Sequence, residues 1–363
     1  MAVGTAQSAP AIAPVGGVAW VRANLFSTPV NTLLTLLGIG LLWLILPPLI
    51  RWGLINAAWS GGLEACKKVQ GSGACWIFIA EKYRLMLFGL YPYEEQWRPL
   101  LMTVILILLL LASMHRQFWR PWLAAAWVAG YLAMGVLMWG GVLGLPFVET
   151  DKWGGLPLTL ILTVNAIVFS FPLAIALALG RRSELPVIRT LCIFFIEIVR
   201  GVPLLSVLFV ASLMIPLFLP SGMDINKLLR AQIGIILFTG AYVAEVIRGG
   251  LQALPKGQLE AADSLGLGYW QKTGFIVLPQ ALSLVIPPMV NSFIATFKDT
   301  SLVIIIGLFD LFGAARAAAN DPAWRPFYVE GLLFVALIYF VFCYSLASYS
   351  RYLEKLARRG DVR

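Results

Sequence analysis

The side chains of this chain that could do chemistry are a few charged groups set within long apolar runs. Two acid–base pairs occur at i,i+3 spacing, Glu197 with Arg200 and Glu245 with Arg248. On a helix, residues three apart share a face and can form an ion pair. Ionisable residues within a membrane span cost about 2.5–3.5 kcal/mol each near its centre, so they usually face a bundle interior or a water path. Mutual neutralisation near the interface and lining of a polar path are therefore both open interpretations.

The sequence offers little for catalysis. It has one histidine, His115, within the basic run MHRQFWR, and it has no phosphate-binding loop of the Gly-x-x-x-x-Gly-Lys-Ser/Thr type. Its four cysteines form no Cys-x-x-Cys pair, so no metal site is predicted. We expect a protein that is not an enzyme and that binds no cofactor or metal itself. Any energised work must then draw on a partner or an ion gradient.

Composition places the chain in a membrane. Of its 363 residues, 60% are hydrophobic and 12% charged, and the mean hydropathy is +0.85. Soluble domains carry about a quarter charged residues. The net charge of +9 comes from Lys and Arg in short clusters between apolar runs, which is typical of membrane anchors rather than of a nucleic-acid surface. An all-α integral membrane protein is predicted, with lipid and no nucleic acid among its partners.

About eight membrane spans must position the charged groups, since a span needs about 20 apolar residues. They are expected at residues 31–50, 97–114, 122–146, 156–180, 190–219, 231–250, 282–309 and 331–349. The third contains a Gly140-x-x-x-Gly144 pair. Residues 1–30 are expected to form a flexible tail rather than a cleaved signal. Residues 31–150 then hold three spans with an outside loop at 51–96, and residues 151–363 hold five.

The distribution of Lys and Arg orients these spans, because cytoplasmic loops carry the excess. From Leu156 onward, one set of loops contains Arg181, Arg182, Arg189, Arg248, Lys256, Lys272, Arg351, Lys355, Arg358, Arg359 and Arg363. The alternate set contains only Lys227, Arg230, Arg316 and Arg325. Both termini and the loop at 255–279 are therefore expected in the cytoplasm. The loop at 51–96 is expected outside, although it carries five basic residues of its own.

Two cysteines lie in that outside loop, within LEACKKVQGSGACW. Cys66 and Cys75 are nine residues apart with a Gly-Ser-Gly turn between them. An oxidising compartment would favour a disulfide that closes this small loop. Two unpaired thiols are the alternative.

The most polar insert between spans is PKGQLEAADSLGLGYWQKTGFIVLPQA, Pro255–Ala281. Pro255 can start a short helix that runs to about Leu265, and Gly266 follows where a left-handed residue ends such a helix. A helix this short is not stable alone, so it must pack against its own membrane core or a partner. An ordinary amphipathic interfacial helix remains an alternative from the spacing alone.

This insert resembles the EAA loop of the permeases of ABC importers. Glu260-Ala261-Ala262, then Gly266, then Ile276-x-Leu278-Pro279 match that pattern at each fixed position. Its flanks, and IEIVRGVPLLSVLF at Ile196–Phe209, look like the polar amino-acid subfamily, and the likeness covers about residues 157–353. The NLFSTPVNTLLTLL stretch and the three added spans look like the M-type subunit of general L-amino-acid importers.

The resemblance implies a five-helix type I permease core, with three N-terminal helices added to it. It also implies that the two short helices dock on a cytoplasmic ATPase. Carried over residue by residue, the docking elements would be Gln258, Glu260, Ala261, Ala262, Gly266, Leu278 and Pro279. The family pattern often has Arg or Lys after the second Ala, where this chain has Asp263.

For substrate, the resemblance implies an L-amino acid, a zwitterion that needs both charge signs and hydrogen bonds. The candidate residues of a translocation path are Asn291, Lys298, Asp299, Thr300, Glu197, Arg200 and Glu245. A purely structural Lys298–Asp299 pair is an equal alternative. The implied partners are a second homologous permease subunit, two copies of an ATPase that binds the ATP, and a periplasmic amino-acid-binding protein.

We therefore expect a permease subunit of an ATP-driven importer in a bacterial inner membrane. The alternative is an ion-coupled secondary transporter or channel that acts without an ATPase. A membrane sensor or scaffold would need a signalling domain, which this sequence lacks.

Overall fold

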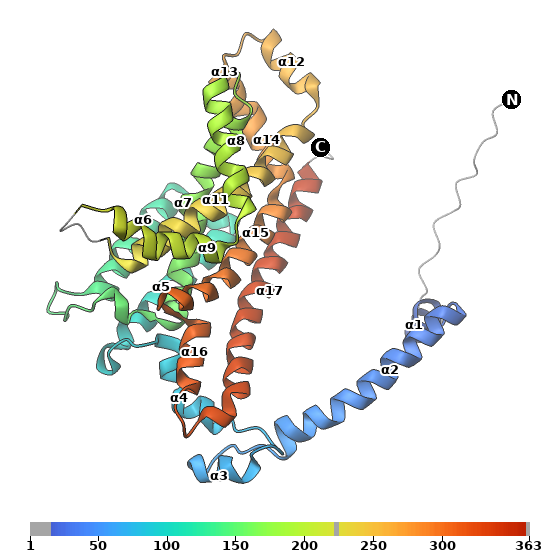
Figure 1. Ribbon diagram of the computed structural model, residues 1–363. Coiled ribbons are helices and arrows are strands. Elements are labelled where there is room, and N and C mark those ends of the chain that lie inside the picture. The colour runs from blue at the N-terminus through green and yellow to red at the C-terminus, as the bar shows by residue number, and fades with distance from the viewer. Residues whose placement is uncertain (1–15, 221–224, 361–363) are drawn as a thin grey trace. The chain divides into compact units, whose positions relative to one another are not determined.

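The computed structural model describes residues 16–220 and 225–360 of the chain (Figure 1). The chain divides into two compact units, Met1–Ile77 and Phe78–Arg363. Regular structure in the described residues is nearly all helical, with one two-residue strand, β1 (Phe309–Asp310). The sequence expectations for residues 1–15, 221–224 and 361–363 lie outside the described residues.

Between residues 16 and 76, the first unit contains three α-helices, α1 (Gly17–Leu25), α2 (Pro29–Ile50) and α3 (Gly62–Val69). The side chain of Thr28 caps α2 by accepting a hydrogen bond from the backbone of Asn31, and Pro29 occupies the first turn, where its missing N–H is not needed. With the π-helical turn that follows, the apolar helix reaches from Pro29 to Ile55, which is long enough to cross a bilayer.

Helix α1 differs from the flexible tail expected over residues 1–30. Residues 17–25 read GVAWVRANL, and Ala, Leu and Arg among them are good helix formers. The side chain of Asn24 donates to the carbonyl of Trp20 one turn earlier, at 2.8 Å. This part of the expected tail is therefore helical.

The small loop that follows α2 is closed by a disulfide between Cys66 of α3 and Cys75, whose Cα atoms lie 5.2 Å apart. Both cysteines are fully buried. The indole N–H of Trp76 donates to the carbonyl of Gly53 at 2.8 Å, and its ring lies against those of Trp52 and Trp59. The loop thus folds back on the end of the first span.

The second unit is a helical bundle. Its α-helices are α4 (Ile77–Phe88), α5 (Trp97–Met114), α6 (Pro121–Trp139), α7 (Gly155–Arg181), α8 (Pro186–Gly201), α9 (Leu204–Phe209), α10 (Ile215–Phe218), α11 (Lys227–Ala253), α12 (Lys256–Ser264), α13 (Tyr269–Lys272), α14 (Leu278–Leu284), α15 (Ile286–Asp299), α16 (Leu311–Ala319) and α17 (Tyr328–Gly360). In the described residues of the whole chain, seven helices are long and apolar enough to cross a membrane, and a bent pair makes an eighth. The prediction of about eight spans is confirmed.

The centre of this unit is the pair α7 and α11, which run side by side (Figure 1). Helix α8 packs on both, α14 and α15 pack on α11, and α17 packs on α15 and α16. Helices α5 and α6 form a hairpin whose α5 contacts α7. The buried side chains form a large apolar cluster toward the N-terminal end of α7 and a smaller one toward its C-terminal end.

The span expected over residues 190–219 is broken rather than straight. Helix α8 ends at Gly201, and the chain turns by 104° before α9 continues. Val202 and Pro203 are both extended. A residue before proline disfavours the helical region, so the break lies where the sequence demands it.

Two other expected spans are shorter than predicted. Helix α6 ends at Trp139, and Gly140 and Gly144 lie in a turn with φ of +69° and +75°, so the pair is not a helix-packing motif. A side chain at Gly140 would meet the carbonyl oxygen of Pro146 at 2.2 Å, which explains why glycine is required there. The seventh span is interrupted at Val285 and ends in a 3₁₀ segment, Thr300–Ile306, before Gly307.

Candidate functional site

The polar insert forms two short helices, α12 and α13, joined by a left-handed turn at Gly266 with φ +72°. The N–H of Gly266 donates to the carbonyl of Asp263, and the N–H of Leu267 donates to that of Ala262. These two bonds are the Schellman pattern, which satisfies the last carbonyls of a helix. The Gly266 position therefore fixes the angle between the helices.

Side chains hold the two helices to their surroundings. The ammonium of Lys272 on α13 contacts a carboxylate oxygen of Asp263 on α12 at 2.5 Å. The amide of Gln280 on α14 donates to the side-chain oxygen of Gln258 on α12 at 3.2 Å. The first contact thus joins the two helices of the loop, and the second ties the loop to the helix that follows it in sequence.

The outer surface of this loop combines charge, small residues and bare apolar groups. Glu260, Ala261 and Gly266 are exposed, while Ala262 is buried. Leu265 is 75% exposed and Trp270 76% exposed. Exposed apolar groups of this size at the ends of membrane spans occur on surfaces that contact another protein or the lipid interface. Leu265 lies at the end of α12, beside the turn, and its side chain is not buried with that of Ala262.

The loop continues directly into the bundle. Leu278 and Pro279 begin α14, with Pro279 in the first turn. The smaller apolar cluster joins α7, α8, α11 and α14, and Leu259 of α12 packs against it. Movement of the loop therefore acts on packed helices rather than on a free linker.

The predicted acid–base pairs belong to one network centred on Glu245. Its carboxylate lies 2.8 Å from both Arg181 and Arg248 and 3.6 Å from Arg200. Glu197 pairs with Arg181 at 2.8 Å, not with Arg200. The expected Glu245–Arg248 pair is present and the expected Glu197–Arg200 pair is not among the described ion pairs. The reason is that Arg181, at the end of α7, reaches both acids.

A second polar region lies where α11 and α15 meet. The hydroxyls of Thr239 and Thr296 are 3.2 Å apart and join the two helices. Beside them is a hollow of about 360 Å³, which Asn291, Asp299 and Tyr242 help to line. A carboxylate, an amide and hydroxyls around one space can bind a polar solute.

Not every predicted path residue faces this hollow. Lys298 lines a separate space with residues of α17, among them Tyr339 and Cys343. Thr300 is fully buried, and its hydroxyl donates to the carbonyl of Phe297. No Lys298–Asp299 ion pair occurs within the described residues, since the two side chains line different spaces.

Two important residues were absent from the sequence prediction. Arg181 was counted only as a topology charge, and nothing in its local spacing links it to acids 16 and 64 residues away. Asp310 is fully buried and accepts hydrogen bonds from the N–H of Gly313 and the hydroxyl of Tyr339. Its place as the cap before an alanine-rich helix was the signal that could have identified it.

Residues 170–359 match the family described as binding-protein-dependent transport system inner membrane component. That range is 190 of 363 residues, more than half of the chain. The chain belongs to this family. The membership confirms the predicted family and makes the protein a multi-pass inner-membrane component of an ABC transport system.

Full-length relatives agree with this membership. The chain is 52% identical over 348 residues to the inner membrane amino-acid ABC transporter permease protein YhdY of Escherichia coli, covering 94% of this chain and 93% of the relative. It is 39% identical over 428 residues to the glutamate/glutamine/aspartate/asparagine transport system permease protein BztC of Rhodobacter capsulatus, covering 98% of each. These matches include the three N-terminal spans.

Among solved structures, the chain is similar to one described as an amino acid ABC transporter with histidines. The identity is 32% and the TM-score 0.49, with 56% of this chain and 92% of that chain covered. Members of the family work with a separate ATPase and a binding protein. An inner-membrane subunit that has no ATPase site of its own is consistent with this membership.

Proposed function

We propose that this protein is the membrane permease subunit of an ATP-driven, binding-protein-dependent importer for L-amino acids. The observation that carries the proposal is the α12–α13 loop. It presents Glu260, Ala261 and bare apolar groups outward, while Lys272 joins its two helices and Gln280 of α14 ties it to the helix behind. A secondary transporter has no need of such a surface.

We propose that this surface docks on a cytoplasmic ATPase, so that the loop and both termini face the cytoplasm. The complete importer would contain a second homologous permease subunit, two ATPase copies and a periplasmic amino-acid-binding protein. ATP binds to the partner, and this chain needs no cofactor of its own. The five spans from α7 onward would form the transport core.

Closure of the ATPase would move the docked loop, and the smaller apolar cluster would pass that movement to α11 and α15. Glu245 and its arginines lie on the α7, α8 and α11 segments beside this cluster, so the same movement would rearrange the ion-pair network. The hollow lined by Asn291 and Asp299 would hold the polar part of the substrate. Lys298 and Thr300 then act as supporting residues rather than as substrate ligands.

We propose that the loop closed by Cys66 and Cys75 lies outside the cytoplasm, where the disulfide can persist. The mass of its loop peptide with and without reduction tests this directly. Two free thiols in the non-reduced protein from membranes would contradict it.

The decisive test is ATP-dependent uptake by the complete complex in liposomes. Gly266→Ala should reduce uptake, because a Cβ in the left-handed region costs about 1 kcal/mol or more, although open space surrounds the position. Gly268→Ala is the matched control, since Gly268 has φ −66° and accommodates a side chain.

Glu260→Lys should abolish uptake and co-purification of the ATPase. Normal uptake by both Gly266→Ala and Glu260→Lys would refute the docking role, and uptake without ATP would favour an ion-coupled carrier.

A further inference from the structure

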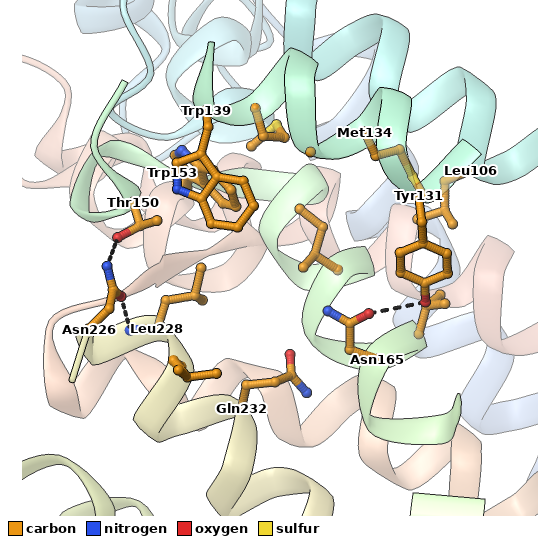
Figure 2. Close-up of a pocket in the computed structure, with 15 residues that line it drawn as sticks. Leu106, Tyr131, Met134, Trp139, Thr150, Trp153, Asn165, Asn226, Leu228 and Gln232 are labelled. Carbon is orange, nitrogen blue, oxygen red and sulfur yellow. Dashed lines mark hydrogen bonds between the residues drawn. The ribbon is translucent and has the colours of Figure 1, made fainter. Parts of the chain in front are cut away.

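A separate hollow of about 320 Å³ lies between the α5–α6 hairpin and the core helices α7 and α11 (Figure 2). Its walls are mostly apolar and include Leu106, Tyr131 and Met134. An adjoining hollow of about 390 Å³ shares Trp139, Thr150 and Asn226 with it. The two hollows therefore adjoin and are considered together: the first is the apolar part, and the second, lined by charged side chains, is the mouth.

Buried polar atoms without partners gather around this space. In the described part of the chain, four buried side-chain atoms have no hydrogen-bond partner. Trp153 Nε1 and Gln232 Oε1 belong to residues that line the apolar part, and Arg230 Nε belongs to a residue that lines the mouth. Trp153 is 3% exposed and Gln232 is 7% exposed. Buried polar groups are normally satisfied, so three orphans around one space indicate an occupant with polar atoms.

The mouth carries balanced charge. Glu149 and Asp151 precede α7, and Lys227 and Arg230 lie at the start of α11. Over residues 16–220 and 225–360, none of these four side chains takes part in an ion pair. One guanidinium nitrogen of Arg230 donates to the carbonyl of Ser212 at 2.8 Å, which holds the group in place. Two carboxylates and two cationic side chains at the mouth are complementary to a ligand that carries both a positive and a negative charge.

We propose that this space binds one membrane phospholipid whose head group is a zwitterion with a primary amine. An acyl chain would fill the apolar part between α6 and α11. The phosphate would accept hydrogen bonds from Arg230 Nε and Lys227 Nζ, and the ammonium would donate to Glu149 or Asp151. Trp153 Nε1 would donate to an ester carbonyl below the phosphate, and a trapped water would donate to Gln232 Oε1.

The location favours a lipid over a soluble zwitterion such as a free amino acid. Trp139 is 45% exposed and Leu229 is 52% exposed, and both lie at the edge of the hollow on membrane-spanning helices. Such faces meet the acyl chains of the bilayer. Tryptophan is also enriched at the level of lipid head groups, where the mouth with its charges lies. The α5–α6 hairpin would then seal a lipid against the permease core.

Native mass spectrometry of the purified complex in detergent tests the proposal, with phosphatidylethanolamine, phosphatidylcholine and phosphatidylglycerol added in equal amounts. The wild-type complex should retain phosphatidylethanolamine preferentially. The double variant Lys227→Gln, Arg230→Gln should bind it at least about tenfold more weakly, which corresponds to about 1.4 kcal/mol. Arg316→Gln with Arg325→Gln removes the same charge from residues outside the site and should change nothing.

A second variant tests the apolar part without touching a charge. Gly135 lines the hollow, and an added Cβ would lie 3.9 Å from the Trp139 ring, so Gly135→Leu places a side chain in the space without a clash at its Cβ. It should displace the lipid, whereas Gly38→Leu, on an open face of α2, should not. Equal retention of the three lipids, retention by both site variants, or displacement of the lipid by a free L-amino acid would overturn the proposal.

Discussion

Lys272 Nζ lies 2.5 Å from Asp263 Oδ1 and so joins α13 to α12 across the turn at Gly266. Asp263 is the position at which related EAA loops often carry a basic residue. A basic side chain there could not pair with Lys272. We therefore predict an internal role for this acid, which is to hold the angle of the loop that Gly266 sets.

Reversal of either charge should weaken this link, and reversal of both should restore it. Exposed pairs contribute about 0.2–1 kcal/mol, so Asp263→Lys or Lys272→Asp alone should reduce ATP-dependent uptake by up to about fivefold. The double swap should recover most of the loss. Lys256→Asp, on the same loop but outside the pair, is the control for charge alone. A double swap that is no better than either single variant would show that the pair does not set the loop angle.

The Glu245 network should be far more sensitive than the exposed acid beside it. The Glu245 side chain is 12% exposed and neutralises up to three arginines, whereas Glu197 is 55% exposed and meets one. Removal of one partner from a buried ion pair costs about 3–5 kcal/mol, and removal from a surface pair costs about 1 kcal/mol or less. Glu245→Gln should therefore lower the thermal unfolding temperature in detergent by several degrees, and Glu197→Gln should barely change it. Equal decreases in unfolding temperature for the two variants would show that the Glu245 network contributes no more to stability than a surface ion pair.

Much of this architecture followed from the sequence, because a bilayer imposes a simple rule of length and polarity. Local signals were reliable in part: Gly266 ends α12 as predicted. The break of the fifth span at Val202-Pro203 was not predicted, although the proline was a signal for it. The partners of Glu197 and Glu245 could not be read from the sequence, because Arg181 meets them only through the packing of α7 against α8 and α11. Spacing at i,i+3 correctly paired Arg248 with Glu245 but wrongly paired Arg200 with Glu197, since Arg200 lies 3.6 Å from Glu245 instead.

The sequence was also unable to show which residues of the candidate substrate path face the same hollow. Asn291, Lys298 and Asp299 share one helix, but their directions depend on which neighbours α15 meets. Asp299→Asn should reduce uptake of an L-amino acid at least about tenfold while the complex still assembles, since it removes a charge from the hollow beside α11. Lys298→Met should reduce uptake much less, because that side chain lines the opposite space. Uptake assays and size-exclusion profiles of both variants separate transport from assembly, and an equal loss in both would refute this assignment.

Asp310 should make stability depend on pH. Burial raises the pKa of its carboxyl to about 6 from 3.8, although the N–H of Gly313 and the hydroxyl of Tyr339 act in the opposite direction. The folded state then binds this proton more tightly than the unfolded state, so the contribution of Asp310 to stability is greatest below about pH 4 and is lost as the pH rises through about 6. A shift of this size corresponds to about 3 kcal/mol. Asp310→Asn removes the titrating group and should flatten this part of the stability curve, measured by thermal unfolding at a series of pH values.

Asp321→Asn is the contrasting control: Lys82 lowers the pKa of that carboxyl, so its contribution is lost as the pH falls. An unchanged pH dependence in Asp310→Asn would show that another group governs this range.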